Sequence, residues 1–213
     1  MKPISKQKVR EFVAGCREIA AHGLVRCSSG NVSWRVDGGR MLIKTSRAWI
    51  ADITAAGVAV CRIADGAALN DRRPSAEVGF HAGILRARPD VNVVLHFQTP
   101  CATALASMTG RKPNYFVIPE IPFYIGPIGV VPYLPPGTEA LAGAVTAAMR
   151  QHNLVQLRNH GQATVAADFR HAIQNAVFFE MACEILLHGG KAVRPISRAY
   201  ARALMKAPAS AKV

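Results

Sequence analysis

The chain has 213 residues, of which half are hydrophobic and 18% are charged, so it suits one large domain with a real core and excludes a disordered chain. Its net charge of +13 is spread along the sequence, apart from residues 186–213, which carry six Lys/Arg and no acidic residue. No apolar run reaches the roughly 18–20 residues that span a bilayer, and charges interrupt the N-terminal stretch that a signal peptide would need.

The five cysteines are odd in number and form no Cys-x-x-Cys pair, which predicts free thiols and a cytoplasmic protein. A basic protein suits an anionic small molecule, acidic lipid or nucleic acid. No zinc finger, RNP strand or KH loop accompanies the charge. We therefore expect no specific nucleic-acid partner and no membrane attachment, and we interpret residues 191–213 as a solvated basic tail.

The first third of the chain is expected to form one helix followed by three strands. An amphipathic helix is predicted over residues 5–22, where Phe12, Cys16 and Ile19 share a face and Ser5 provides the N-cap. The turn Asp37-Gly38-Gly39 joins two strands into a hairpin. The three strands are predicted over residues 32–36, 40–45 and 58–63.

The rest of the chain alternates between helices and strands. Pro74 and Ser75 are expected to open a helix that ends before Pro89, and Thr138 and Asp168 to cap two later helices. The other predicted segments are a buried strand at 91–97, a helix at 99–107, short strands and loops at 114–136, and strands at 154–158 and 162–166. This mixture predicts an α/β fold with a mixed, mostly antiparallel sheet flanked by helices.

A few polar side chains are spaced as metal ligands would be. His96 and Gln98 share one face at the end of an apolar strand, and His160 lies in a turn between two strands. Glu77 and His81 are four residues apart and share a helical face. Such groups suit zinc or a similar divalent ion if they converge. Each also has a structural explanation, as a hydrogen-bonded core residue or, for His81, as a side chain that packs or holds Glu77 in place.

The order of several short motifs resembles the class II aldolase/adducin family, which includes L-fuculose-1-phosphate aldolase, ribulose-phosphate epimerases and methylthioribulose-phosphate dehydratases. The motifs are Gly30-Asn31-Val32-Ser33, Ile43-Lys44-Thr45-Ser46, Pro74-Ser75-Ala76-Glu77, Arg88-Pro89-Asp90-Val91 before His96, Pro136-Gly137-Thr138-Glu139, Asn159-His160-Gly161, and Glu180 with Ala182. The resemblance covers roughly residues 8–190 and implies a single class II aldolase/adducin-like domain over 1–213. It also implies a homotetramer with active sites between subunits.

The resemblance implies a role for particular residues. The metal ligands correspond to His96, Gln98, His160 and Glu77, and Glu77 is also the acid/base. The substrate phosphate would meet Gly30, Asn31, Thr45, Ser46 and Ser75. Zinc is the expected ion, with manganese, iron or cobalt as alternatives. The implied enzyme is a metal-dependent carbon–carbon lyase, either an aldolase or a decarboxylase, that acts through a metal-stabilised enolate on a small anionic hydroxy-carbonyl or sugar-phosphate-like substrate.

Three positions depart from the family pattern. Gln98 replaces a histidine, and its amide binds metals more weakly than imidazole, so the site either uses Gln98 as a ligand or has lost its metal. Ala76 replaces a serine in the phosphate pocket. Arg47 replaces a glycine there and either crowds a phosphate out, clamps a carboxylate, or points away as a surface residue.

The proton donor is open to more than one assignment. An ungapped alignment places Val117 at the family's catalytic tyrosine, so Tyr115, two residues away, is the expected donor and Tyr124 is the next candidate. Tyr200 is the candidate for the family's second tyrosine, in the tail. The competing interpretation of the whole chain is a non-catalytic binding module, like the adducin head, with a degenerate metal site. The joint retention of Glu77, His96 and His160 favours the enzyme.

Overall fold

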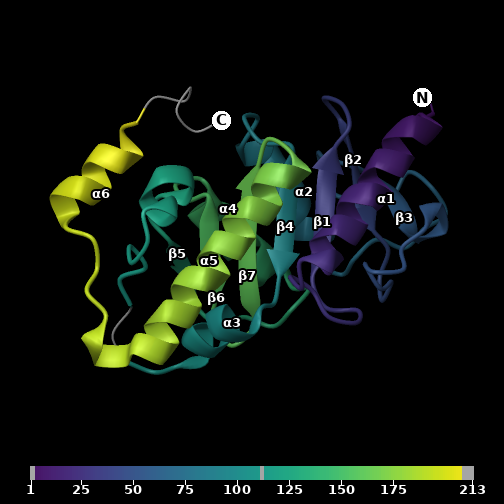
Figure 1. Cartoon of the computed structure of the whole chain (residues 1–213). Helices are drawn as coiled ribbons and strands as arrows, with labels where there is room; N and C mark the ends of the chain where they lie inside the picture. The colour runs from purple at the N-terminus through teal and green to yellow at the C-terminus, as the bar shows by residue number, and fades with distance from the viewer. Residues whose placement is uncertain (1–2, 111–112, 208–213) are drawn as a thin grey trace.

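Seven strands form the centre of the protein (Figure 1). The structure is a computed structural model that describes residues 3–110 and 113–207. The strands are β1 (Asn31–Arg35), β2 (Arg40–Lys44), β3 (Val58–Arg62), β4 (Val93–Phe97), β5 (Gly129–Val131), β6 (Leu154–Leu157) and β7 (Gly161–Ala166). Their order in the sheet is β3-β2-β1-β4-β7-β6-β5. Every neighbouring pair is antiparallel except β5 and β6. The predicted α/β fold with a mixed, mostly antiparallel sheet is therefore confirmed.

Several helices begin where the sequence places capping side chains. The helices are α1 (Lys6–Ala21), α2 (Val78–Ala87), α3 (Pro100–Ser107), α4 (Glu139–Met149), α5 (Phe169–Gly189) and α6 (Arg198–Met205), with short turns η1 (Ala55–Gly57), η2 (Ile121–Ile125) and η3 (Gly190–Ala192). Ser5, Thr138 and Asp168 each accept a hydrogen bond from the N–H three residues further on, as predicted. Within the described residues, no helix is both long and apolar enough to cross a bilayer.

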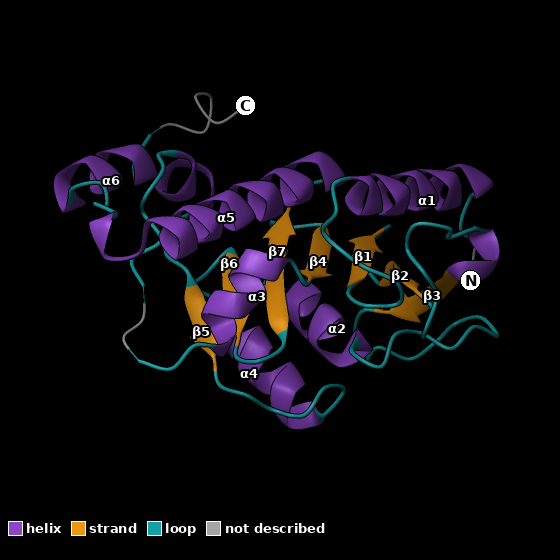
Figure 2. Cartoon of the chain, turned by 60° about the horizontal axis from the view of Figure 1, so that its bottom comes forward, coloured by secondary structure: helices purple, strands orange, loops and turns teal. Residues whose placement is uncertain are grey.

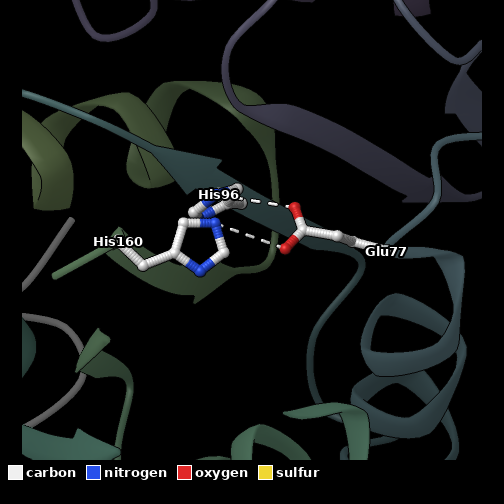
Figure 3. A group of neighbouring side chains, drawn as sticks. All are labelled: Glu77, His96 and His160. Carbon is white, nitrogen blue, oxygen red and sulfur yellow. Dashed lines mark ion pairs between the residues drawn. The ribbon is translucent and has the colours of Figure 1, made fainter. Parts of the chain in front are cut away.

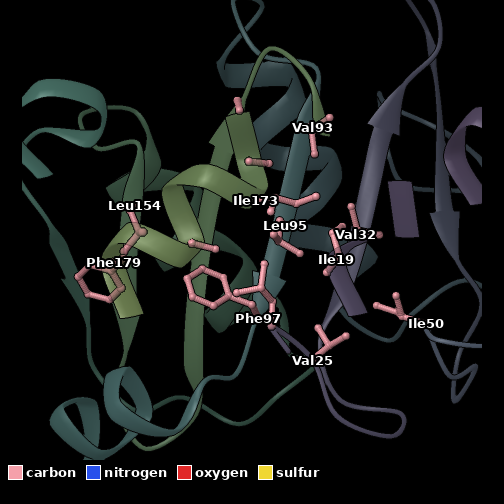
Figure 4. Close-up of a cluster of buried hydrophobic side chains, with 14 of the residues drawn as sticks. Ile19, Val25, Val32, Ile50, Val93, Leu95, Phe97, Leu154, Ile173 and Phe179 are labelled. Atoms are coloured by element: carbon pink, nitrogen blue, oxygen red, sulfur yellow. The ribbon is translucent and has the colours of Figure 1, made fainter. Parts of the chain in front are cut away.

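The helices cover both faces of the sheet, with α1 and α5 along one face and α2 and α4 along the other (Figure 2). Side chains alternate along each strand. In β4, Val93, Leu95 and Phe97 join the cluster under α1 and α5 (Figure 4), whereas Val94 joins the cluster under α2 and α4. This confirms that the strand is buried on both faces. It also puts His96, two residues after Val94, on the face of α2.

Helix α2 begins later than the sequence predicts. Pro74 pairs with Thr45 in an isolated bridge, and the N–H of Ser75 donates to the carbonyl of Lys44 at 3.0 Å. These contacts keep residues 74 and 75 extended against the end of β2, so Glu77 becomes the N-cap residue and Val78 the first helical residue. The correction matters because it moves Glu77 from the side of a helix to its N-terminal end.

The solvated tail predicted after residue 190 is partly wrong. Helix α6 lies within it, buries Ala201, and packs against η2, a single turn of π-helix in the segment where the sequence predicts only short strands and loops. The backbone N–H of Ile196 donates to the carbonyl of Phe116 at 2.8 Å, which fixes the approach to α6. Residues 208–213 of the predicted tail lie outside the described residues.

Glu180 of α5 holds the start of α3. Its two carboxylate oxygens accept hydrogen bonds from the N–H groups of Cys101 and Ala102, each at 2.8 Å, while Thr99 makes no side-chain cap. A carboxylate at a helix N-terminus satisfies free N–H groups and favours the helix dipole.

We expect Glu180→Ala to lower the free energy of unfolding by about 2–3 kcal/mol, because two charge-assisted hydrogen bonds are lost and two N–H groups lose their partners. Urea unfolding of the variant measures the loss. Glu184→Ala, which removes an exposed carboxylate one turn further along α5, is the matched control and should change the stability by less than about 0.5 kcal/mol.

Candidate metal centre

Three strand ends meet at one edge of the sheet on the face of α2. Asn31, at the start of β1, lies opposite His96, near the end of β4. Strand β7 runs antiparallel to β4, so His160, just before β7, returns to the same edge. Glu77 reaches this edge from the N-terminus of α2 (Figure 3). The antiparallel register thus gathers residues from distant parts of the chain.

Glu77, His96 and His160 form one compact group. Nε2 of His96 lies 3.5 Å from Oε2 of Glu77, and Nε2 of His160 lies 3.5 Å from Oε1 of Glu77. One possible ligand atom from each residue lies within 4.8 Å of the others. His96 is 1% exposed and Glu77 is 8% exposed. The separations are too long for hydrogen bonds yet suit atoms that surround a cation.

The hydrogen-bonding state of the three residues fits a divalent metal ion. Nδ1 of His96 donates to the carbonyl of Gln162 at 2.8 Å, so its Nε2 carries the free lone pair. That Nε2 and Oε1 of Glu77 are buried and have no hydrogen-bond partner. Burial and the neighbouring His96 lower the pKa of His160, while Glu77 opposes them, so the imidazole of His160 is neutral near pH 7. Two imidazoles and a carboxylate are a common donor set for zinc and iron.

Gln98 lies beside this group but faces a different space. It lines a groove with Arg26, Thr99, Thr103 and other residues, and none of the three grouped residues takes part in that groove. Its Cγ packs over Gly161, where a Cβ would come within 2.7 Å of it. The role of Gln98 as a ligand stays a prediction.

The residues predicted to bind phosphate lie on adjoining loops. The N–H of Ser46 donates to the carbonyl of Arg73, which joins the Thr45–Ser46 segment to the one that carries Ser75. The buried ammonium of Lys44 donates to the carbonyls of Ser28 and Ala48, at 2.8 and 2.9 Å, and so ties the loop before β1 to the loop after β2. The structure thus brings these loops together, and their contact with a phosphate stays a prediction.

Gly30 and Arg47, which lie in these loops, have positive φ angles. Gly30 has φ of 64°, and a Cβ there would lie 2.7 Å from the carbonyl oxygen of His96, so this position requires glycine. Arg47 has φ of 62° and an exposed side chain. A residue with a Cβ in this region costs about 1–2 kcal/mol, so the arginine is kept at a position that glycine would occupy without strain.

None of the candidate tyrosines lies in the group. The hydroxyl of Tyr115 accepts from Nε2 of Gln156, and its ring packs on Phe179 in the cluster under α1 and α5. Burial raises the pKa of Tyr115 to about 12. Tyr124 stacks on Phe178, and Tyr200 is 73% exposed on α6. The sequence-based choice of Tyr115 as proton donor therefore has no support from its position in this chain and remains untested.

Comparison with known proteins places this geometry in a family. The family model described as "Class II Aldolase and Adducin N-terminal domain" matches residues 10–187. The chain belongs to this class II aldolase and adducin family. It is 25% identical over 186 residues to a 3-oxo-tetronate 4-phosphate decarboxylase of Pectobacterium atrosepticum, covering 85% of each chain. It is 30% identical over 178 residues to a 5-methylthioribulose-1-phosphate/5-deoxyribulose-1-phosphate aldolase of Rhodospirillum rubrum, covering 81% of this chain and 77% of that one.

Solved structures give the same result for the fold. A solved structure of an L-fuculose 1-phosphate aldolase superposes with a TM-score of 0.86 at 23% identity, covering 95% of this chain and 96% of that chain. The two sequence relatives named above are a decarboxylase and an aldolase. This class II aldolase family member is thus an enzyme, a metal-dependent lyase of the aldolase or decarboxylase type.

Two features of the centre were not predicted from the sequence. Asn31, expected to bind phosphate, donates its side-chain amide to Oε2 of Glu77 at 2.8 Å. His81, expected to touch Glu77 directly if at all, instead bonds to Asn31. Helical spacing suggested a contact between residues 77 and 81, but Glu77 lies at the helix N-cap and no longer follows that spacing.

Proposed function

We propose that this enzyme cleaves a carbon–carbon bond beside the carbonyl group of a small phosphorylated hydroxy-carbonyl compound. The observation that carries the proposal is the convergence of Glu77, His96 and His160, in which Nε2 of His96 and Oε1 of Glu77 are buried and have no hydrogen-bond partner. The relatives named above act on phosphorylated compounds by decarboxylation or aldol cleavage. Both reactions remove a group from the carbon next to a carbonyl and leave negative charge on oxygen.

Glu77, His96 and His160 would hold the divalent cation, zinc first among the candidates. When bound, that ion supplies a Lewis acid for the negative charge that develops on the substrate oxygens. The carboxylate of Glu77 would accept or return a proton at the reacting carbon through Oε1, which has no hydrogen-bond partner. The backbone and hydroxyl groups of Thr45, Ser46 and Ser75 would orient the phosphate, with Gly30 and Asn31 beside them.

The natural assembly and compartment follow from the same proposal. We infer a homotetramer with active sites between subunits, in which a neighbouring subunit completes a site that contains no tyrosine of its own chain among the described residues. Size-exclusion chromatography with light scattering tests the assembly. The five cysteines are all free, which suits a reducing compartment such as the cytoplasm.

The central test is metal content followed by turnover. The purified enzyme should contain about one divalent ion per chain, and a chelator should remove both the ion and the activity. Phosphorylated 3-oxo acids and ketose 1-phosphates are the substrates to offer, with release of carbon dioxide or an aldehyde as the readout. A protein that binds no zinc, manganese, iron or cobalt at micromolar concentrations would contradict the proposed metal centre.

Arg47 offers a test of the substrate pocket. We expect Arg47→Gly to raise the preference for phosphorylated over carboxylated substrates, because it removes bulk and an alternative anion clamp from the phosphate loops. Glycine removes the strain of the positive φ, but it also gives the unfolded chain more conformational entropy. The two effects nearly cancel, so the free energy of unfolding should change by less than about 1 kcal/mol. The ratio of kcat/KM values for the two substrate classes measures the effect. Arg72→Ala removes an exposed positive charge nearby and should leave that ratio unchanged.

A further inference from the structure

A line of buried polar side chains runs from Glu77 into the space between β1 and α2. Nδ2 of Asn31 donates to Oε2 of Glu77 at 2.8 Å, and Oδ1 of the same amide is hydrogen-bonded to Nε2 of His81. Nδ1 of His81 lies 2.8 Å from the hydroxyl of Ser33. The four side chains are between 0 and 8% exposed. None of the motif-based predictions gave His81 or Ser33 a role in the chemistry.

The direction of each hydrogen bond in this line follows from the one before it. A carboxylate only accepts, so the NH₂ group of Asn31 must face Glu77 and its oxygen must face His81. Nε2 of His81 must then carry the ring proton. Burial, with His96 nearby, lowers the pKa of His81 well below its usual value, so the ring is neutral and Nδ1 is an acceptor. The hydroxyl of Ser33 therefore donates to it.

The line satisfies both ends of the Asn31 amide and leaves one oxygen of Glu77 free. If the amide turned over, its oxygen would face the carboxylate at hydrogen-bond distance, and two acceptors would repel each other in a buried site. The proton on Nε2 of His81 favours the same orientation, because the reversed amide would set its NH₂ group against an N–H. The ring is itself held by Ser33 and by stacking on Phe80, with ring centroids 4.6 Å apart.

We propose that His81, anchored by Ser33, is a positioning residue that acts through Asn31 to fix the carboxylate of Glu77 with Oε2 occupied and Oε1 free. The proposal rests on the proposed function, because under that function the free oxygen of Glu77, Oε1, meets a cation and a proton. In this proposal the side chain of Asn31 connects His81 to Glu77 by hydrogen bonds, instead of contacting the phosphate.

Substitutions at His81 separate this role from simple packing. Glutamine offers an oxygen to Ser33 and an NH₂ group to Asn31, with the polarity of the neutral ring, whereas phenylalanine fills the space and offers neither. We expect His81→Phe to weaken Co²⁺ binding about 10- to 100-fold, as loss of a ligand's outer partner does, and His81→Gln to stay within about threefold of the wild type. Titration of the metal-free protein with Co²⁺, followed by its visible absorption, measures both.

The control is Thr164→Val, which removes a buried hydroxyl that donates to the carbonyl of Asn153 in the same sheet but has no link to Glu77. It should lower the melting temperature without changing Co²⁺ affinity. If His81→Phe bound Co²⁺ as tightly as wild type, or if Thr164→Val lost as much affinity, the positioning role would be overturned.

A second readout does not depend on any metal. Nitrogen-15 NMR of the histidine rings in the metal-free protein should show His81 protonated on Nε2. In Glu77→Ala nothing dictates the orientation of Asn31, so His81 should become a mixture of both tautomers. An Nδ1-protonated ring in the wild type, or a His81 signal that ignores Glu77→Ala, would overturn the proposal. A wild type that binds no Co²⁺ but shows this coupling would instead contradict the proposed function alone.

Discussion

Replacing His160 by alanine is expected to abolish metal binding while the fold survives. His160 lies in the turn before β7 and contributes one of three converging donor groups, so its loss leaves a two-ligand site. Loss of an outer partner of a ligand already weakens metal affinity about 10- to 100-fold, so loss of a direct ligand should exceed about 100-fold. Elemental analysis after dialysis against zinc and titration with Co²⁺ measure the effect.

The matched control is His171→Ala. His171 is an exposed histidine in the first turn of α5 that pairs with Asp168 at 2.8 Å. It should keep full metal content, and both variants should melt cooperatively. A His160→Ala protein that retained one ion per chain would show that the ion is held elsewhere and would remove the basis of the proposed function.

Replacing Glu77 by glutamine is expected to lower kcat by about 10²- to 10⁴-fold, the usual contribution of a positioned acid or base. The amide has nearly the shape of the carboxylate, so the core and the start of α2 should be unaffected. It cannot accept a proton at the reacting carbon, and it lacks the charge that balances a divalent cation. Steady-state kinetics on the substrate found by the screen, together with metal content, separate these two losses.

Glu18→Gln, which changes an exposed glutamate of α1, is the control and should keep wild-type turnover. If Glu77→Gln bound the metal more weakly and excess metal did not restore kcat, Glu77 would act in proton transfer as well as in metal binding. Undiminished turnover would disprove its role as the acid/base.

Local signals in the sequence predicted most of the fold. Side-chain caps such as Ser5 and Asp168 place helix starts because they satisfy N–H groups within one turn of the same helix. Features that depend on distant contacts were missed. Helix α2 starts later than predicted because the N–H of Ser75 bonds to Lys44 of β2. Helix α6 forms in a segment that the sequence predicted to be a basic tail, because its packing against η2 depends on residues far away in the chain.

The candidate site shows the same division. His96 and His160 were identifiable because each lies at a strand end within a short motif, and the sheet register then brings them together. The partners of Glu77 were not identifiable, since the contact from Asn31 joins residues 46 positions apart. The sequence also could not show that Tyr115 is turned into the core, because an aromatic residue in a Pro-rich segment carries no periodicity.

The pairing of β1 with β4 couples correct assembly of the centre to formation of the hydrophobic interior. Because successive side chains point to opposite faces, a slip of one residue would carry Asn31 and Ser33 to the side of α1 and α5 and would turn Val32 toward the candidate metal centre. A sheet with the wrong register would thus lose both its hydrophobic packing and the candidate metal centre. One inserted residue within β1 should therefore be far more damaging than one in the exposed hairpin turn at Gly38, at the opposite end of the same strand.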